Sequence, residues 1–156
     1  MKVVYSGRPI ADLELIASYY RALPFASDDW TVLTMAPDGS WGAATSYPID
    51  QAIAAAIANC RIAYQREIGC GAIFTSIQLG WSLGIRCGDR NIVVAEKTLA
   101  GAEQAALRRE MELRQLYAPE MPPCRRVVTV DPNGMVVLPH SDELAAGGVV
   151  GGHDIE

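Results

Sequence analysis

Basic side chains and long apolar runs are scarce in this sequence of 156 residues. It has 13 lysines and arginines against 18 aspartates and glutamates, which gives a formal net charge of −5. A nucleic-acid-binding protein needs a clustered basic face, and this balance argues against one. No apolar run approaches the roughly 18 residues that a membrane-spanning helix requires. We therefore expect neither nucleic-acid binding nor membrane insertion.

Cysteines and histidines are also few. The cysteines are Cys60, Cys70, Cys87 and Cys124, and the histidines are His140 and His153. Four cysteines are too few for a disulfide-dense mini-protein. They allow two disulfides in three pairings, or four free buried thiols. Structural zinc usually needs two closely spaced pairs of ligands, and these spacings are long. We therefore expect no metal and no cofactor.

Half of the residues are apolar and a fifth are charged, so the sequence can build a hydrophobic core. Its length fits one globular domain, which we place at residues 1–138. Residues 139–156 carry four glycines and a terminal acidic pair, so we expect a flexible tail. Arginine outnumbers lysine eleven to two, a usage typical of a GC-rich bacterial genome.

The N-terminal part predicts a short strand at Val3–Tyr5 and a helix over residues 11–23. Leu13, Ile16, Tyr20 and Leu23 share one face of this predicted helix. Pro24 ends it, because proline cannot continue a helix.

Two later segments carry the same predicted order of elements, which is two strands, a helix and a third strand. In the first segment, residues 30–76, the strands are Trp30–Met35, Trp41–Tyr47 and Gly71–Ser76, and the helix runs from about Ile49 to Gln65. In the second, residues 81–130, the strands are Trp81–Arg86, Asn91–Ala95 and Arg125–Val130, and the helix runs from its N-cap Thr98 to about Tyr117. The expected apolar stripe of the second helix includes Leu99, Ala102, Ala106, Leu113 and Leu116. A turn at 131–134 and a strand at Met135–Leu138 follow.

The two segments align with each other. Trp30 aligns with Trp81 at an offset of 51 residues, and Ala52 aligns with Ala102 at an offset of 50 residues. We interpret this as a tandem ββαβ repeat, because one such unit cannot bury its sheet and helix faces alone. The predicted fold class is α+β, with a mainly antiparallel sheet, helices packed on it and the N-terminal helix alongside.

Trp-Gly-Ala at positions 41–43, an alanine-rich helix carrying Cys60, and Cys70 opening an apolar strand resemble one family. This family consists of small, usually exported proteobacterial domains of unknown function with tandem Trp-Gly-Ala/Cys repeats. The resemblance spans about residues 30–130 and implies a Cys60–Cys70 disulfide, export and a binding or accessory role. The second segment departs from the pattern, with Asn-Ile-Val at positions 91–93 and Glu110 in place of the helix cysteine.

The residues themselves leave the cysteine chemistry open. A helix that ends near Gln65 allows Cys60 and Cys70 to bridge, and Cys87 and Cys124 form a second candidate pair. The alternative is four buried free thiols. Residues 1–11 lack the apolar core of a signal peptide. We therefore expect a periplasmic or secreted protein if a leader lies upstream, and a cytoplasmic one otherwise.

Gly80-Trp-Ser-Leu-Gly84 matches the G-x-S-x-G pattern of serine hydrolases. Asp131 and then His140 or His153 follow in the chain order of a triad, so Ser82, Asp131 and His153 are an alternative catalytic set. The nucleophile elbow must lead from a strand into a helix, however. Here Gly84 is followed by the rest of a strand and a turn, which argues against this alternative.

Three residues are candidates for a binding surface. Trp41 directly follows a turn, where a partly exposed ring can line such a surface. Asp38 and Asp89 occupy equivalent turns in the two segments. We therefore expect a non-catalytic binding or accessory domain of a bacterial, envelope-associated protein and not an enzyme. A small serine hydrolase and a structural subunit of a larger assembly are the alternatives. A protein partner or self-association is allowed, and no small molecule is identified.

Overall fold

The computed structural model describes residues 3–7, 28–116 and 119–139, and contains two helices and eight strands within them. The strands are β1 (Val3–Gly7), β2 (Trp30–Met35), β3 (Trp41–Ser46), β4 (Gly69–Ile77), β5 (Trp81–Cys87), β6 (Arg90–Glu96), β7 (Cys124–Val130) and β8 (Val136–Val137). The helices are α1 (Ile49–Ala63) and α2 (Leu99–Leu116). The helix predicted over residues 11–23 lies outside the described residues, as does the predicted tail from residue 140 onward.

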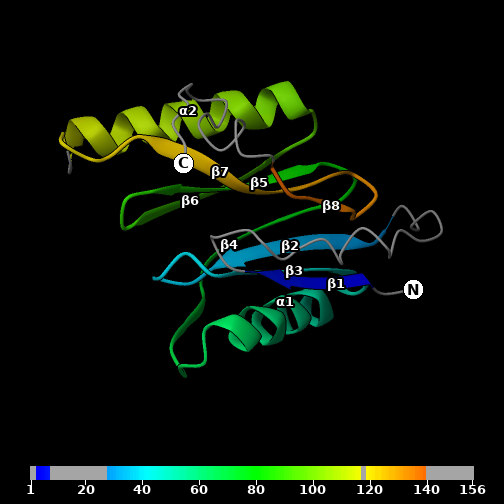
Figure 1. Cartoon of the computed structure of the whole chain (residues 1–156). Helices are drawn as coiled ribbons and strands as arrows, with labels where there is room; N and C mark the ends of the chain where they lie inside the picture. Colours follow the sequence, from blue (N-terminus) through cyan, green and yellow to red (C-terminus); the bar gives the residue numbers. More distant parts are fainter. Residues whose placement is uncertain (1–2, 8–27, 117–118, 140–156) are drawn as a thin grey trace.

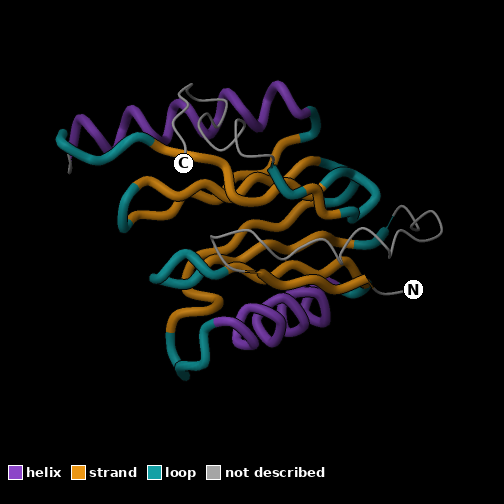
Figure 2. Tube along the Cα trace, viewed as in Figure 1, coloured by secondary structure: helices purple, strands orange, loops and turns teal. Residues whose placement is uncertain are grey.

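The strands form two antiparallel sheets of four strands each. The first has the order β1-β3-β2-β4 and the second the order β6-β5-β7-β8. The sheets lie face to face, with α1 on the outer side of the first and α2 on the outer side of the second (Figure 1, Figure 2). The predicted α+β class is therefore confirmed, and the molecule has four layers in the order helix, sheet, sheet, helix.

The central core lies between the two sheets. Its buried members are Leu33, Met35, Trp41 and Ala43 from the first sheet and Val127, Val128, Val130 and Val136 from the second. Side chains alternate between the two faces of a strand, so the other face of each sheet is free to pack against its helix. This burial on both faces accounts for the continuous apolar and β-branched runs in β2 and in residues 127–130 of β7.

Each helix buries one face against its own sheet, mostly through small residues. The buried positions are Ala52, Ala56 and Cys60 in α1 and Ala102, Ala106 and Leu113 in α2. The apolar stripe predicted for α2 is wrong at Leu116, which is 66% exposed. Leu116 is the last residue of α2, and Figure 1 shows the last turn of this helix extending beyond the strands.

Hydrogen bonds mark both ends of α2. The backbone N–H of Gly101 donates to Oγ1 of Thr98 at 3.0 Å, which confirms the predicted N-cap. Arg114 pairs with Glu110 at 3.1 Å near the other end. No helix in the described ranges is long and apolar enough to cross a membrane.

Candidate binding site

Both disulfides lie at one end of the sandwich. Cys60 near the end of α1 is bonded to Cys70 near the start of β4, with 5.9 Å between the Cα atoms. Cys87 at the end of β5 is bonded to Cys124 at the start of β7, with 4.0 Å between the Cα atoms. The structure thus forms both predicted pairs, and the end that they join also carries the β2–β3 and β5–β6 turns (Figure 1).

The two turns are bound to each other across the sheets. The Arg86 guanidinium donates to the carbonyl oxygen of Pro37 at 2.9 Å and to Oδ1 of Asn91 at 2.8 Å. The Asn91 amide in turn donates to the carbonyl oxygen of Ala36 at 2.7 Å. The β2–β3 turn therefore has a fixed position relative to the β5–β6 hairpin.

The aspartates predicted as binding residues, Asp38 and Asp89, are exposed on these two turns. Both lie close enough to Arg86 to act on its pKa. Burial lowers the pKa of Arg86, the neighbouring Arg125 lowers it further, and the carboxylates of Asp38 and Asp89 oppose this by raising it. The structure therefore places the two aspartates near one half-buried cation.

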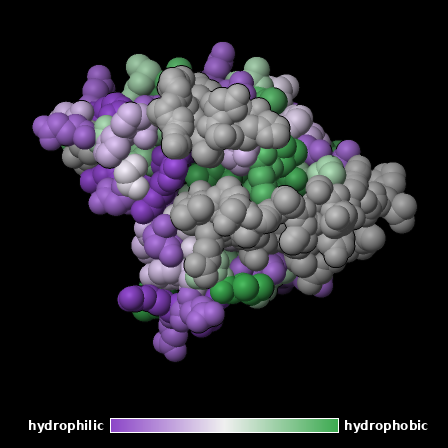
Figure 3. Space-filling model, viewed as in Figure 1, coloured by the Kyte–Doolittle hydropathy of each residue, from purple (hydrophilic) through white to green (hydrophobic). Residues whose placement is uncertain are grey.

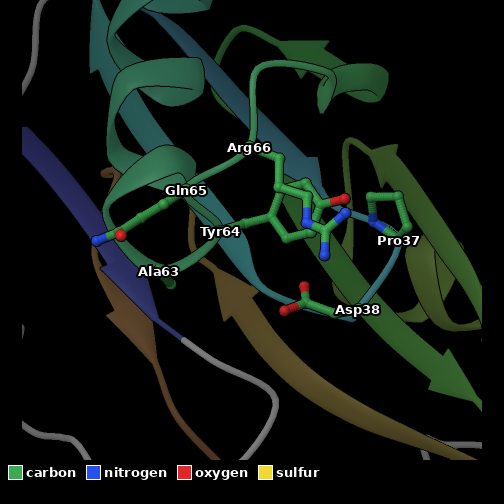
Figure 4. A pocket seen from close by; sticks show the side chains of 6 residues that line it. All are labelled: Pro37, Asp38, Ala63, Tyr64, Gln65 and Arg66. Atoms are coloured by element: carbon green, nitrogen blue, oxygen red, sulfur yellow. The ribbon is translucent and has the colours of Figure 1, made fainter.

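A pocket opens beside the β2–β3 turn. It has a volume of about 680 Å³ and is lined by Pro37, Asp38, Ala63, Tyr64, Gln65 and Arg66. In Figure 4 the side chains of Tyr64 and Arg66 extend toward Pro37 and Asp38, whereas Gln65 points the other way. Hydrophilic side chains predominate at this end of the molecule (Figure 3, left). The pocket offers a carboxylate, a guanidinium and a phenol.

Packing around Gly69 holds the wall of this pocket. Gly69 is buried with φ +139°, and a Cβ atom there would lie 2.5 Å from Cε2 of Tyr64 and 2.9 Å from Cδ of Pro37. The Tyr64 ring can pack against the backbone of Gly69 only because that residue has no side chain. The Cys60–Cys70 disulfide brackets the same loop, so the pocket is built into the fold.

Sequence reasoning did not single out Tyr64 or Arg66 as binding residues. The sequence pattern places Tyr64 in the apolar stripe of α1. It gives Arg66 no role beyond that of a charged residue in a loop. Their common signal is that both fall between two cysteines that bond to each other, because a short disulfide loop holds its side chains in place.

The expectation that Trp41 lines a binding surface is wrong. Its side chain is 2% exposed and belongs to the core between the sheets. Trp41 and Ala43 lie on the same face of β3, the one turned toward the second sheet. The indole Nε1 of Trp41 is buried without a hydrogen-bond partner in the described part of the chain.

The catalytic alternative built on Ser82 does not match its surroundings. Ser82 is fully buried inside β5, and the strand continues to Cys87 in place of turning into a helix. Oδ1 of Asp131 accepts the backbone N–H groups of Asn133 and Met135, both at 2.9 Å, so this carboxylate stabilises a turn. His140 and His153 lie outside the described residues. A buried strand serine cannot present its hydroxyl to a substrate, and we do not propose this activity.

Among the described residues, no three histidine, cysteine, aspartate or glutamate side chains are grouped closely enough to hold a metal ion.

No family model, curated protein or solved structure matches this chain.

Proposed function

We propose that this chain is a non-catalytic binding domain whose site is the pocket between the β2–β3 turn and the end of α1. The observation that carries this proposal is a preformed pocket at the end of the molecule that two disulfides hold together. A pocket that needs no rearrangement binds with a smaller loss of conformational entropy. The fixed loop therefore favours recognition over a merely structural role.

The charges in the pocket indicate the class of ligand. In the described part of the chain, neither Asp38 nor Arg66 takes part in an ion pair. Oδ1 of Asp38 accepts the backbone N–H of Ser40 at 2.9 Å, which orients the carboxylate and leaves its second oxygen for a ligand. A small ligand with an ammonium and a carboxylate complements Asp38 and Arg66 together. We therefore propose a zwitterionic ligand.

We also propose that the protein acts in an oxidising compartment, outside the bacterial cytoplasm. Disulfides persist in such compartments and are rare in the cytosol. The resemblance to exported Trp-Gly-Ala/Cys repeat domains supports the same location. Thiol titration of natively produced protein, denatured without reductant, is expected to find no free thiols. Four reactive thiols would contradict this location.

We infer, further, that the chain is a tandem ββαβ repeat. The elements β2, β3, α1 and β4 occur in the same order as β5, β6, α2 and β7. The strand order β3-β2-β4 in one sheet matches β6-β5-β7 in the other. The buried Ala52 and Ala56 of α1 lie 50 residues before the buried Ala102 and Ala106 of α2. These matches favour duplication of one unit.

The ligand class can be tested by NMR titration with the dipeptide alanyl-alanine. We expect amide shifts for Ala36, for residues 38–40 and for residues 64–66. The shifts should be weaker with the N-acetylated and the C-amidated dipeptides, because each lacks one charge. Asp38→Asn and Arg66→Gln should each weaken binding by roughly 10-fold, the loss of one charge-assisted contact.

Arg61→Gln is the matched control, because Arg61 is an exposed cation on α1 that does not line the pocket. It should bind the dipeptide as the unaltered protein does. Equal shifts with all three dipeptides would contradict a zwitterion site. An absence of shifts around the pocket with every dipeptide would contradict the proposed function.

A further inference from the structure

Strand β6 is an open edge of the second sheet. It pairs with β5 from Trp81↔Glu96 to Cys87↔Arg90, and no strand pairs with its other side in the described part of the chain. A groove of about 370 Å³ follows this edge, lined by the four consecutive residues from Asn91 to Val94 and by one side of α2. Alternate residues of a strand face opposite ways. A groove that touches four in a row therefore runs along the backbone edge.

The edge lacks the usual protection against pairing with another strand. Natural edge strands are commonly interrupted by proline or carry lysine in the middle. Strand β6 has neither, and its centre is Ile92-Val93-Val94, three β-branched residues that favour strand pairing. Its only charged residues are Arg90 at one end and Glu96 at the other, both exposed.

We propose that two copies of this chain associate through β6, in antiparallel pairing about a twofold axis at Val93. In this register Arg90 of each copy lies opposite Glu96 of the other, and Ile92 lies opposite Val94. Residues opposite each other in antiparallel strands share a face, so each Arg90–Glu96 pair lies on the α2 side of the sheet. Centring the axis on Ile92 or on Val94 would leave both charges without an opposite partner. Charge complementarity therefore selects this one register.

The neighbouring edge of the other sheet supports the same occupant. Strand β4 is the edge of the first sheet and contacts β6, so the open edges of both sheets lie on one side of the molecule. It exposes 39% of Ile73 and 42% of Phe74, and Ile73 also lines the groove along β6. A second copy seated on β6 would cover this apolar edge too. An isologous dimer of this kind also leaves no complementary surface open for further chain growth.

Sedimentation equilibrium or light scattering of the purified chain tests the proposal. The expected mass is twice the 16.8 kDa of the chain. Arg90→Glu and Glu96→Arg each place like charges opposite each other at both ends of the interface. Each variant should raise the dimer dissociation constant by roughly 10–100-fold. The double variant Arg90→Glu/Glu96→Arg restores two opposite-charge pairs and should dimerise again.

Mixing the two single variants gives a stricter test of the register. Neither single variant can form favourable pairs with itself, but an equimolar mixture forms two and should yield heterodimers. Arg61→Glu and Glu120→Arg are matched charge reversals at exposed positions outside β6, and they should leave the mass at that of a dimer. A wild-type chain that stays monomeric into the millimolar range would overturn the proposal. So would a dimer that the β6 variants leave intact. Both outcomes are independent of dipeptide binding in the pocket.

Discussion

Residues 30–77 and residues 81–130 build the same order of strands around one helix, yet they attach that helix in different ways. In the first half, Gly42 on β3 brings α1 so close that a Cβ atom there would lie 2.3 Å from the backbone oxygen of Ala56 and from the backbone nitrogen of Cys60. In the second half, Ile92 on β6 is buried in the core beneath α2. One helix rests on bare backbone and the other on a side chain.

The links between helix and following strand differ as well. Cys60 ties the end of α1 to β4 through its bond to Cys70. Glu110, 50 residues further on, instead pairs with Arg114, and that guanidinium donates to the carbonyl oxygens of Met121 and Pro122 just before β7. A covalent bond and a charged hydrogen-bond network thus join helix and following strand in the two halves, so the same order of elements accommodates two kinds of link.

The largest expected effect comes from exchanging the residues beneath the helices. Gly42→Ile places a branched side chain where even one carbon would meet two backbone atoms of α1. We expect a loss of unfolding free energy above about 4–5 kcal/mol, or failure to fold, measured by urea denaturation. Ile92→Ala is the corresponding truncation in the second half, and it should cost about 2–5 kcal/mol by leaving a cavity. A mild effect of Gly42→Ile would mean that α1 can move away from β3.

The two disulfides should contribute different amounts to the free energy of unfolding. Loop entropy predicts a loss of about 4 kcal/mol for Cys87→Ala/Cys124→Ala, with a sequence separation of 37, and about 3 kcal/mol for Cys60→Ala/Cys70→Ala, with a separation of 10. Thermal and denaturant unfolding of each double variant measures this. The shorter loop also forms the pocket wall, so only the Cys60/Cys70 variant should weaken dipeptide binding. If the Cys60/Cys70 variant bound the dipeptide as tightly as the unaltered protein does, the pocket would not depend on its disulfide.

How far the sequence predicts these features depends on whether they are local. The hairpins, both helices and the Thr98 cap follow from patterns within about 15 neighbouring residues. The burial of Trp41 does not, because it depends on a second sheet whose strands lie up to 95 residues away at Val136. The pocket likewise has Asp38 and Arg66 in one lining, and this depends on the packing of Tyr64 and Pro37 around Gly69. Local patterns predict elements, and contacts between distant segments determine the site.

The charged link of the second half should be weaker than the covalent link of the first. Arg114→Met removes the donors to two carbonyl oxygens and leaves Glu110, whose side chain is 13% exposed, without its cation. We expect a loss of about 2–3 kcal/mol in chemical denaturation, since hydrogen bonds to charged groups are worth about 1.5–3 kcal/mol. Arg109→Met is the control, because the Arg109–Glu112 pair is more than half exposed and should matter little. Equal losses from both variants would contradict a linking role for Arg114.

The smallest expected effect concerns one hydroxyl in each half. Thr31 and Thr45 share a buried hydrogen bond of 2.9 Å in the first sheet, whereas Ser82 lies opposite Ala95 in the second and its buried Oγ has no partner in the described part of the chain. Thr31→Val should cost about 1–3 kcal/mol, because it leaves the Thr45 hydroxyl unsatisfied. Ser82→Ala removes an unpaired polar atom and should be neutral or stabilise the fold by up to about 1 kcal/mol. Denaturant unfolding of both variants measures these changes. A clear loss of unfolding free energy from Ser82→Ala would reveal a hydrogen-bond partner for Ser82. The two halves would then be more alike than their sequences indicate.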